Sequence, residues 1–95
     1  MRLCFYIDPE TGLPHIYKHG IREGEAEEIL LNKTEDYPSR DGLRSAIGQT
    51  SAGRYLRVIY RPGEELVVVT AYELRRNELQ AYKRRMRRSG RRRQR

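Results

Sequence analysis

Three stretches of strand-forming residues, joined by two turn signals, constrain the fold of this chain more than any other feature. Residues 43–49, 55–61 and 66–72 are rich in branched and aromatic side chains, and a short turn-like segment follows each of the first two. In the second of these segments, Pro62 presets the first central position of a type II turn and Gly63 accepts the positive φ of the second. The sequence therefore predicts two consecutive hairpins, which form an antiparallel meander.

Alternation along the meander predicts which side chains share a face. The middle strand should place Leu56, Val58 and Tyr60 on one face and Tyr55, Arg57, Ile59 and Arg61 on the other. Residues 66–71 are apolar on both faces, which predicts that the third strand is the most buried of the sheet.

The N-terminal part of the chain predicts one strand and two short helices. Residues 2–7 have the composition of a strand, which the Asp8-Pro9 pair ends because proline lacks the amide donor that sheet pairing needs. Residues 14–19 predict a short helical segment that stops at Gly20. Apolar residues then recur with helical spacing among glutamates, at Ala26, Ile29 and Leu30, and predict a helix of about ten residues.

The remainder of the chain predicts a loop and a final helix. Residues 32–41, with a proline and several charges, have the composition of a loop. Residues 74 to about 88 are strong helix formers, and Leu79, Tyr82 and Met86 form an apolar stripe by which this helix should dock.

Together these elements predict an α+β fold, with helices on one face of a small antiparallel sheet made of the N-terminal strand and the meander. Residues 1–82 should form this single domain. Residues 83–95 should form a basic helical extension that ends in a disordered tail.

Length and composition narrow the functional classes. A chain of 95 residues has a modest core, so an active site should be a shallow surface. The single cysteine, Cys4, excludes a disulfide framework and a cysteine-built zinc site, and its apolar surroundings predict a small core residue. No apolar run reaches the roughly 18 residues of a membrane span, and residues 2–7 are too short for a signal-peptide core. We therefore expect a cytoplasmic protein without a membrane segment.

The positive charge is concentrated at one end of the chain. Nine of the 20 basic residues lie from Lys83 onward, with no acidic residue among them, so residues 1–82 hold 11 basic and 13 acidic residues. Clustered lysine and arginine favour nucleic acid or an acidic protein as partner, and a solvated tail is the plainer alternative.

Five short motifs within residues 5–82 carry a family resemblance. They are Asp8-Pro9 after the first strand, Lys18-His19-Gly20-Ile21 before the glutamate-rich helix, and the segments 44–50, 53–60 and 68–73. In their order and spacing the chain resembles the RelE/ParE superfamily of small bacterial toxins, and most of all the BrnT-like toxins and related domains of unassigned function. The resemblance implies a RelE/BrnT-like fold and a metal-independent ribonuclease of a type II toxin-antitoxin system. Such an enzyme cuts mRNA, in some cases on the ribosome, needs no cofactor, and is held inactive by a small antitoxin protein.

Metal-free cleavage of RNA needs a base, an acid and cations around the phosphate, and the sequence offers candidates for each. Histidine gains or loses a proton near neutral pH, and Lys18 beside His19 can hold a phosphate. Arg44, on the meander, has the planar fork that grips a phosphate. We expect Lys18, His19, Arg44 and Tyr72 to be the catalytic residues.

A second set of side chains suits the binding of RNA, with arginines and lysine for phosphates and a tyrosine for stacking on bases. The expected RNA-binding residues are Arg54, Tyr55, Arg57, Arg75, Lys83, Arg84, Arg85, Arg87 and Arg88.

Other interpretations remain open at the level of sequence. His15 and His19 have the spacing of a metal-binding pair on a helix, although the sequence offers no third ligand. The same cations suit a non-catalytic module that binds RNA or the ribosome, or a basic surface for an acidic antitoxin-like partner. Each arginine also fits an ordinary surface charge, and Tyr60 and Tyr72 fit core tyrosines whose hydroxyls reach water.

Overall fold

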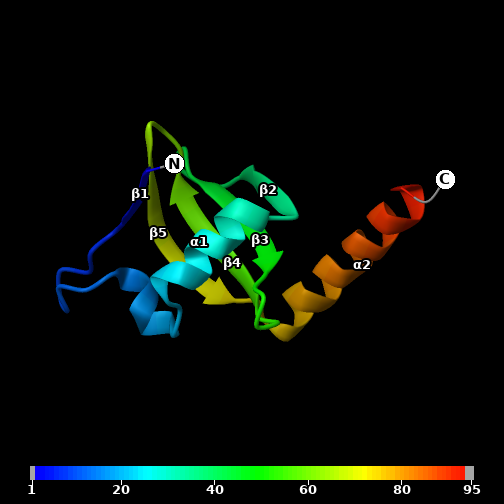
Figure 1. Cartoon of the computed structure of the whole chain (residues 1–95), viewed down its shortest axis with the longest axis horizontal. Coiled ribbons are helices and arrows are strands. Elements are labelled where there is room, and N and C mark those ends of the chain that lie inside the picture. The colour runs from blue at the N-terminus through cyan, green and yellow to red at the C-terminus, as the bar shows by residue number, and fades with distance from the viewer. Residues whose placement is uncertain (1, 94–95) are drawn as a thin grey trace.

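The computed structural model describes the backbone of residues 2–93 and the side chains of residues 2–88. A five-stranded sheet lies at its centre, in the order β1-β5-β4-β3-β2. The strands are β1 (Arg2–Phe5), β2 (Glu35–Pro38), β3 (Arg44–Gln49), β4 (Tyr55–Arg61) and β5 (Glu65–Glu73). The helices are the 3-10 helix η1 (His15–His19), α1 (Glu23–Asn32) and α2 (Arg76–Arg93). The fold is therefore α+β, as expected (Figure 1).

The predicted meander is present. β3 pairs antiparallel with β4, and β4 pairs antiparallel with β5. Alternation along β4 also follows the prediction, since Leu56 and Val58 are fully buried while Arg57 and Ile59 on the other face are half-buried.

The sheet is mixed, and in this respect the prediction of an antiparallel sheet was wrong. β1 pairs in parallel with β5, with Arg2 opposite Glu65 and Phe5 opposite Val68. The direction of this pairing depends on how the chain returns over the sheet, which the local composition of the strand does not encode.

A fifth strand, β2, replaces part of the loop predicted for residues 32–41, and pairs antiparallel with β3. Its composition gave no signal because β2 is a short edge strand, where a proline such as Pro38 is tolerated. β2 is held at the edge of the sheet by side-chain contacts with residues outside it. The Asp36 carboxylate accepts hydrogen bonds from Arg44 and Tyr60, and the Glu35 carboxylate accepts two from Arg85.

The two α-helices cover opposite faces of the sheet, whereas the sequence predicted all helices on one face. Neighbouring residues of β3 show the arrangement, because their side chains point to opposite faces. Ala46 packs in the main core with Ile29 of α1, and Ile47 packs in a second cluster with Tyr82 of α2. The predicted stripe of α2 is confirmed, since Leu79 and Met86 pack around this second cluster.

Burial differs from the prediction in two places. β3 is the most buried strand, with residues 45–48 all buried, while Val68 and Ala71 are the fully buried residues of β5. Both strands are second from an edge of the sheet, but β3 packs against α1 through Ala46 on one face and against α2 through Ile47 on the other. Cys4 is half-buried and lies outside both core clusters, with its thiol donating to the Glu65 carboxylate at 3.3 Å.

The last helix begins at Arg76, and its backbone stays helical to Arg93, beyond the predicted end near residue 88. Figure 1 shows α2 leading away from the sheet. The tail was predicted to be disordered at its end, and residues 94–95 of it lie outside the described residues. Within the described part of the chain, no helix combines the length and apolar character needed to cross a membrane.

Candidate functional site

The short parallel pairing of β1 leaves room for a site at the sheet edge. β1 pairs only with residues 65–68 of β5, and η1 packs against β5. Gly20 ends η1 in the left-handed conformation, with φ +71°, which favours glycine. This arrangement sets the ring of His19 edge-on to the ring of Tyr72, with 6.4 Å between the ring centroids.

His19 and Tyr72 line an open hollow of about 800 Å³ between η1, the end of β5 and the start of α2. Its other lining residues are Thr70, Glu73, Arg75, Asn77 and Glu78. His19 and Arg75 are exposed and Tyr72 is half-buried. Burial raises the pKa of the Tyr72 phenol, although the charge of Arg57 acts in the opposite direction. The hollow therefore combines an imidazole, a neutral phenol and a guanidinium.

A buried carboxylate, Asp8, supports η1. Its Oδ2 atom lies 2.7 Å from Nζ of Lys18 and 3.2 Å from Nδ1 of His15, and its Oδ1 atom accepts the backbone N–H of Glu10. The Lys18 bond, followed by the Glu10 bond, lowers the pKa of Asp8 to about 2, and Asp8 in turn raises the pKa of Lys18. Lys18 is thus paired with a carboxylate and anchors η1.

Asp8 was not among the predicted site residues, although its place directly after the first strand was the available signal. By holding one nitrogen of His15, it sets the ring that packs edge-on to His19, with 5.5 Å between the centroids. His19 therefore lies between His15 and Tyr72. Among the described residues, no group of three or more histidine, cysteine or acidic side chains is arranged to hold a metal ion.

Arg57 lies on β4 opposite Tyr72 of β5, on the same sheet face. Its guanidinium donates to Ser45 Oγ at 2.7 Å and to the hydroxyl of Tyr37, and it lies 3.4 Å from a carboxylate oxygen of Glu78. The side chain is only 14% exposed. Arg57 therefore contributes positive charge beside the hollow while most of its donors are already used by the protein.

Two predicted arginines lie elsewhere. Arg44 is on the opposite sheet face, where its Nε donates to Asp36 at 2.9 Å, so the structure does not bring it together with His19 and Tyr72. The two-residue period of β3 sends Arg44 to the same face as Ala46. Arg54 binds the Glu25 carboxylate at 2.8 Å and the Glu73 carboxylate at 3.2 Å, so it connects α1 to the end of β5.

The predicted tyrosines divide between core and surface. Tyr60 is buried and its hydroxyl donates to Asp36, which makes it a core residue. Tyr55 is half-buried, and its ring lies edge-on to Tyr82 of α2, with 5.9 Å between the centroids. Tyr55 thus lies on a different flank of α2 from the hollow.

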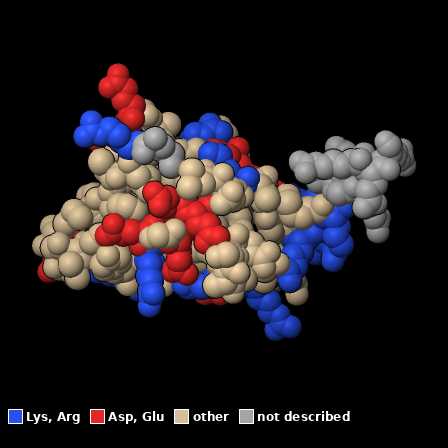
Figure 2. Space-filling view, viewed as in Figure 1, with Lys and Arg blue, Asp and Glu red and all other residues tan. Residues whose placement is uncertain are grey.

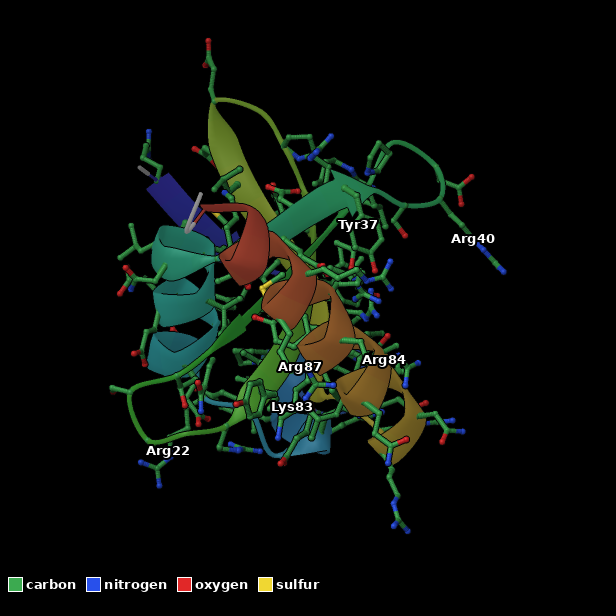
Figure 3. All side chains as sticks on the ribbon, turned by 90° about the vertical axis from the view of Figure 1, so that its right-hand side faces the viewer. Arg22, Tyr37, Arg40, Lys83, Arg84 and Arg87 are labelled. Carbon is green, nitrogen blue, oxygen red and sulfur yellow. The ribbon has the colours of Figure 1, made fainter. Side chains whose placement is uncertain are left out.

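Most of the predicted cations of α2 are free to meet a partner. Lys83, Arg84, Arg87 and Arg88 are exposed, and none lies within 4 Å of an acidic group of the described residues. Arg85 differs, because it makes two hydrogen bonds to Glu35 at 2.7 and 2.8 Å. Figure 2 shows the basic side chains gathered along α2 and acidic ones over the middle of the body, and Figure 3 shows Lys83, Arg84 and Arg87 along the helix.

Comparison of the chain with protein-family models, with curated proteins and with solved structures found no match. Function is therefore inferred from the hollow and from the charge of α2.

Proposed function

We propose that this chain is a toxin-like domain that binds single-stranded RNA and cleaves it, without a metal ion, at the hollow between η1 and α2. The supporting observation is that His19, Tyr72 and Arg75 line one open hollow at the base of a basic helix. These groups supply proton transfer, hydrogen-bond donation and positive charge, which are what cleavage of a phosphodiester by its neighbouring 2′-hydroxyl needs.

In the proposed reaction, the imidazole of His19 accepts the proton of the 2′-hydroxyl, and the 2′-oxygen forms a bond to the adjacent phosphorus. The bond from phosphorus to the 5′-oxygen breaks, and the 5′-oxygen takes a proton from solvent. Tyr72 donates a hydrogen bond to the phosphate and Arg75 offsets its growing negative charge. The products are a 2′,3′-cyclic phosphate and a 5′-hydroxyl.

The same proposal includes a protein that inhibits the domain and the cellular compartment in which the domain acts. A small antitoxin-like protein with an acidic segment complements the exposed cations of α2 and restrains the domain. The domain acts on mRNA in the cytoplasm.

The test is cleavage of single-stranded RNA by the purified chain in the presence of EDTA. Wild type should cut, and His19→Ala should cut about 10²-fold more slowly, which is the usual loss for an acid–base group. Arg75→Ala should slow cutting, while Arg40→Ala, which removes an exposed arginine from the loop after β2, should not. Equal single-turnover rates for wild type and His19→Ala would contradict the proposed role.

A second candidate function is a non-catalytic RNA-binding module. It is favoured by the position of two expected catalytic residues, since Lys18 is paired with Asp8 and Arg44 binds Asp36 on the opposite face of the sheet. RNA binding by wild type without any cleavage would select this function.

A further inference from the structure

A second hollow lies along the flank of α2 that faces away from His19. It has a volume of about 360 Å³, within the range of roughly 300–1,000 Å³ common for small-ligand sites. Its lining residues are Thr34, Gln49, Tyr55, Tyr82, Lys83, Met86 and Arg87. We name it the Tyr55 groove.

The Tyr55 groove combines an aromatic surface with two cations. The ring of Tyr55 is half-buried, and Nζ of Lys83 lies over it, 5.2 Å from its centroid. Arg87 lies one helical turn beyond Lys83, so the two exposed cations share this flank of α2. At the rim, exposed Gln49 carries an amide that can donate to and accept from a base edge.

We infer that the Tyr55 groove binds one unpaired nucleotide of an RNA strand, with its base on Tyr55 and its phosphate between Lys83 and Arg87. The inference rests on the RNA binding of the proposed function but does not need cleavage at His19. In the free protein, Lys83 covers the tyrosine ring by a cation–π contact. An incoming base takes that place, and the flexible stem of Lys83 lets its ammonium follow the phosphate.

The pairing of ring and cations favours a nucleotide over an acidic peptide. A carboxylate would satisfy Lys83 or Arg87 but would leave the ring of Tyr55 without a planar partner. A nucleotide has both a π-face and a phosphate, so it matches both parts of the groove.

The experiment measures the affinity of the full chain for a short RNA and for an abasic RNA strand of the same length. All variants carry His19→Ala, so that the RNA is not cut during the measurement. Tyr55→Leu should weaken binding to the RNA about ten-fold, which is typical for loss of one stacked base, and should leave abasic binding unchanged. Tyr55→Phe keeps the ring and should bind as His19→Ala alone does. Tyr17→Leu, which removes an exposed tyrosine of η1, is the matched control and should have no effect.

Two results would overturn the proposal that a nucleotide binds in the Tyr55 groove. One is an equal loss of affinity for both strands in Tyr55→Leu, and the other is no loss of affinity for either strand.

Lys83→Ala tests the groove at an exposed position. It should flatten the slope of log affinity against log salt by about 0.7, the contribution of one phosphate contact, and an unchanged slope would count against the groove. No RNA binding by the intact chain would overturn both proposals, while base-dependent binding without cleavage would overturn the cleavage proposal alone.

Discussion

At the scale of single residues, Asp8 organises the N-terminal half of the candidate site. Its two carboxylate oxygens connect the backbone of Glu10, the ammonium of Lys18 and the ring of His15. His15 then packs against His19. One buried carboxylate therefore sets the orientation of a residue that it does not touch.

The pKa of Asp8 predicts a specific dependence of stability on pH. It is about 2 in the folded protein and about 3.9 in an unfolded chain, so the folded state binds this proton less tightly. The stabilisation is fully present above about pH 4 and is lost as the pH falls toward about 2. Urea unfolding between pH 6 and 2 should show wild type more stable than Asp8→Asn at pH 6, with the difference shrinking below pH 4. A difference that stays constant over this range would contradict the assignment.

Gly20 provides a second test at this scale. Its φ of +71° is strained for residues with a side chain, and a Cβ at this position would meet no atom within 4 Å. Gly20→Ala should therefore destabilise the fold by about 1–2 kcal/mol through backbone strain alone. Gly24→Ala is the matched control, because Gly24 lies in α1 without a positive φ and has equally open surroundings. It should stabilise by about 0.4–1 kcal/mol in chemical denaturation.

At the scale of elements, α2 is attached to the sheet through residues 79–86. Leu79, Tyr82 and Met86 pack on the sheet face that carries Ile47, and Arg85 binds Glu35 of the edge strand β2. The helix therefore depends on β2 and β3 for its position, and both hollows depend on α2.

Removing the central side chain of this contact should loosen α2. Tyr82 is 4% exposed, so Tyr82→Ala should cost about 3–5 kcal/mol, as loss of a large buried ring usually does. Tyr6→Ala, which removes a tyrosine that is 47% exposed, should cost far less. Thermal unfolding followed by circular dichroism measures both, and similar losses for the two variants would show that α2 is not docked by Tyr82.

The elements also show why sequence predicted some of the fold and missed the rest. The meander and α2 were predictable because their own residues carry turn and periodicity signals. β2 was not, because it depends on contacts with distant residues such as Tyr60 and Arg85. The parallel direction of β1 was not either, because it depends on pairing with residues 65–68 of β5. For the same reason, the residues alone suggested His19 and Tyr72 but could not exclude Arg44, whose face depends on the register of β3.

At the scale of the whole molecule, charge is divided between body and helix. Residues 1–82 have two more acidic than basic residues, and the chain from Lys83 onward has basic residues only. Such a division favours approach of a polyanion along α2, with the acidic body turned away.

This division predicts a salt dependence that belongs to α2. Each phosphate contact on a single strand contributes about −0.7 to the slope of log affinity against log salt, so four contacts contribute about −2.8. Replacing Lys83, Arg84, Arg87 and Arg88 by glutamine should remove about that much of the slope in an RNA-binding titration. Replacing four exposed arginines outside α2, Arg2, Arg22, Arg40 and Arg61, changes the net charge equally and should alter the slope much less. Equal changes would show that net charge alone drives binding.

The parallel pairing of β1 with β5 has a consequence for synthesis. β1 leaves the ribosome before the meander, and its partner residues lie more than sixty positions later in the chain. At roughly 5–20 residues per second, β1 waits several seconds before residues 65–68 are made. The meander can pair locally as it emerges, so the free edge of β5 stays open until β1 returns to it. An open edge can template pairing with other chains, so newly made copies at high concentration are most prone to association in this interval.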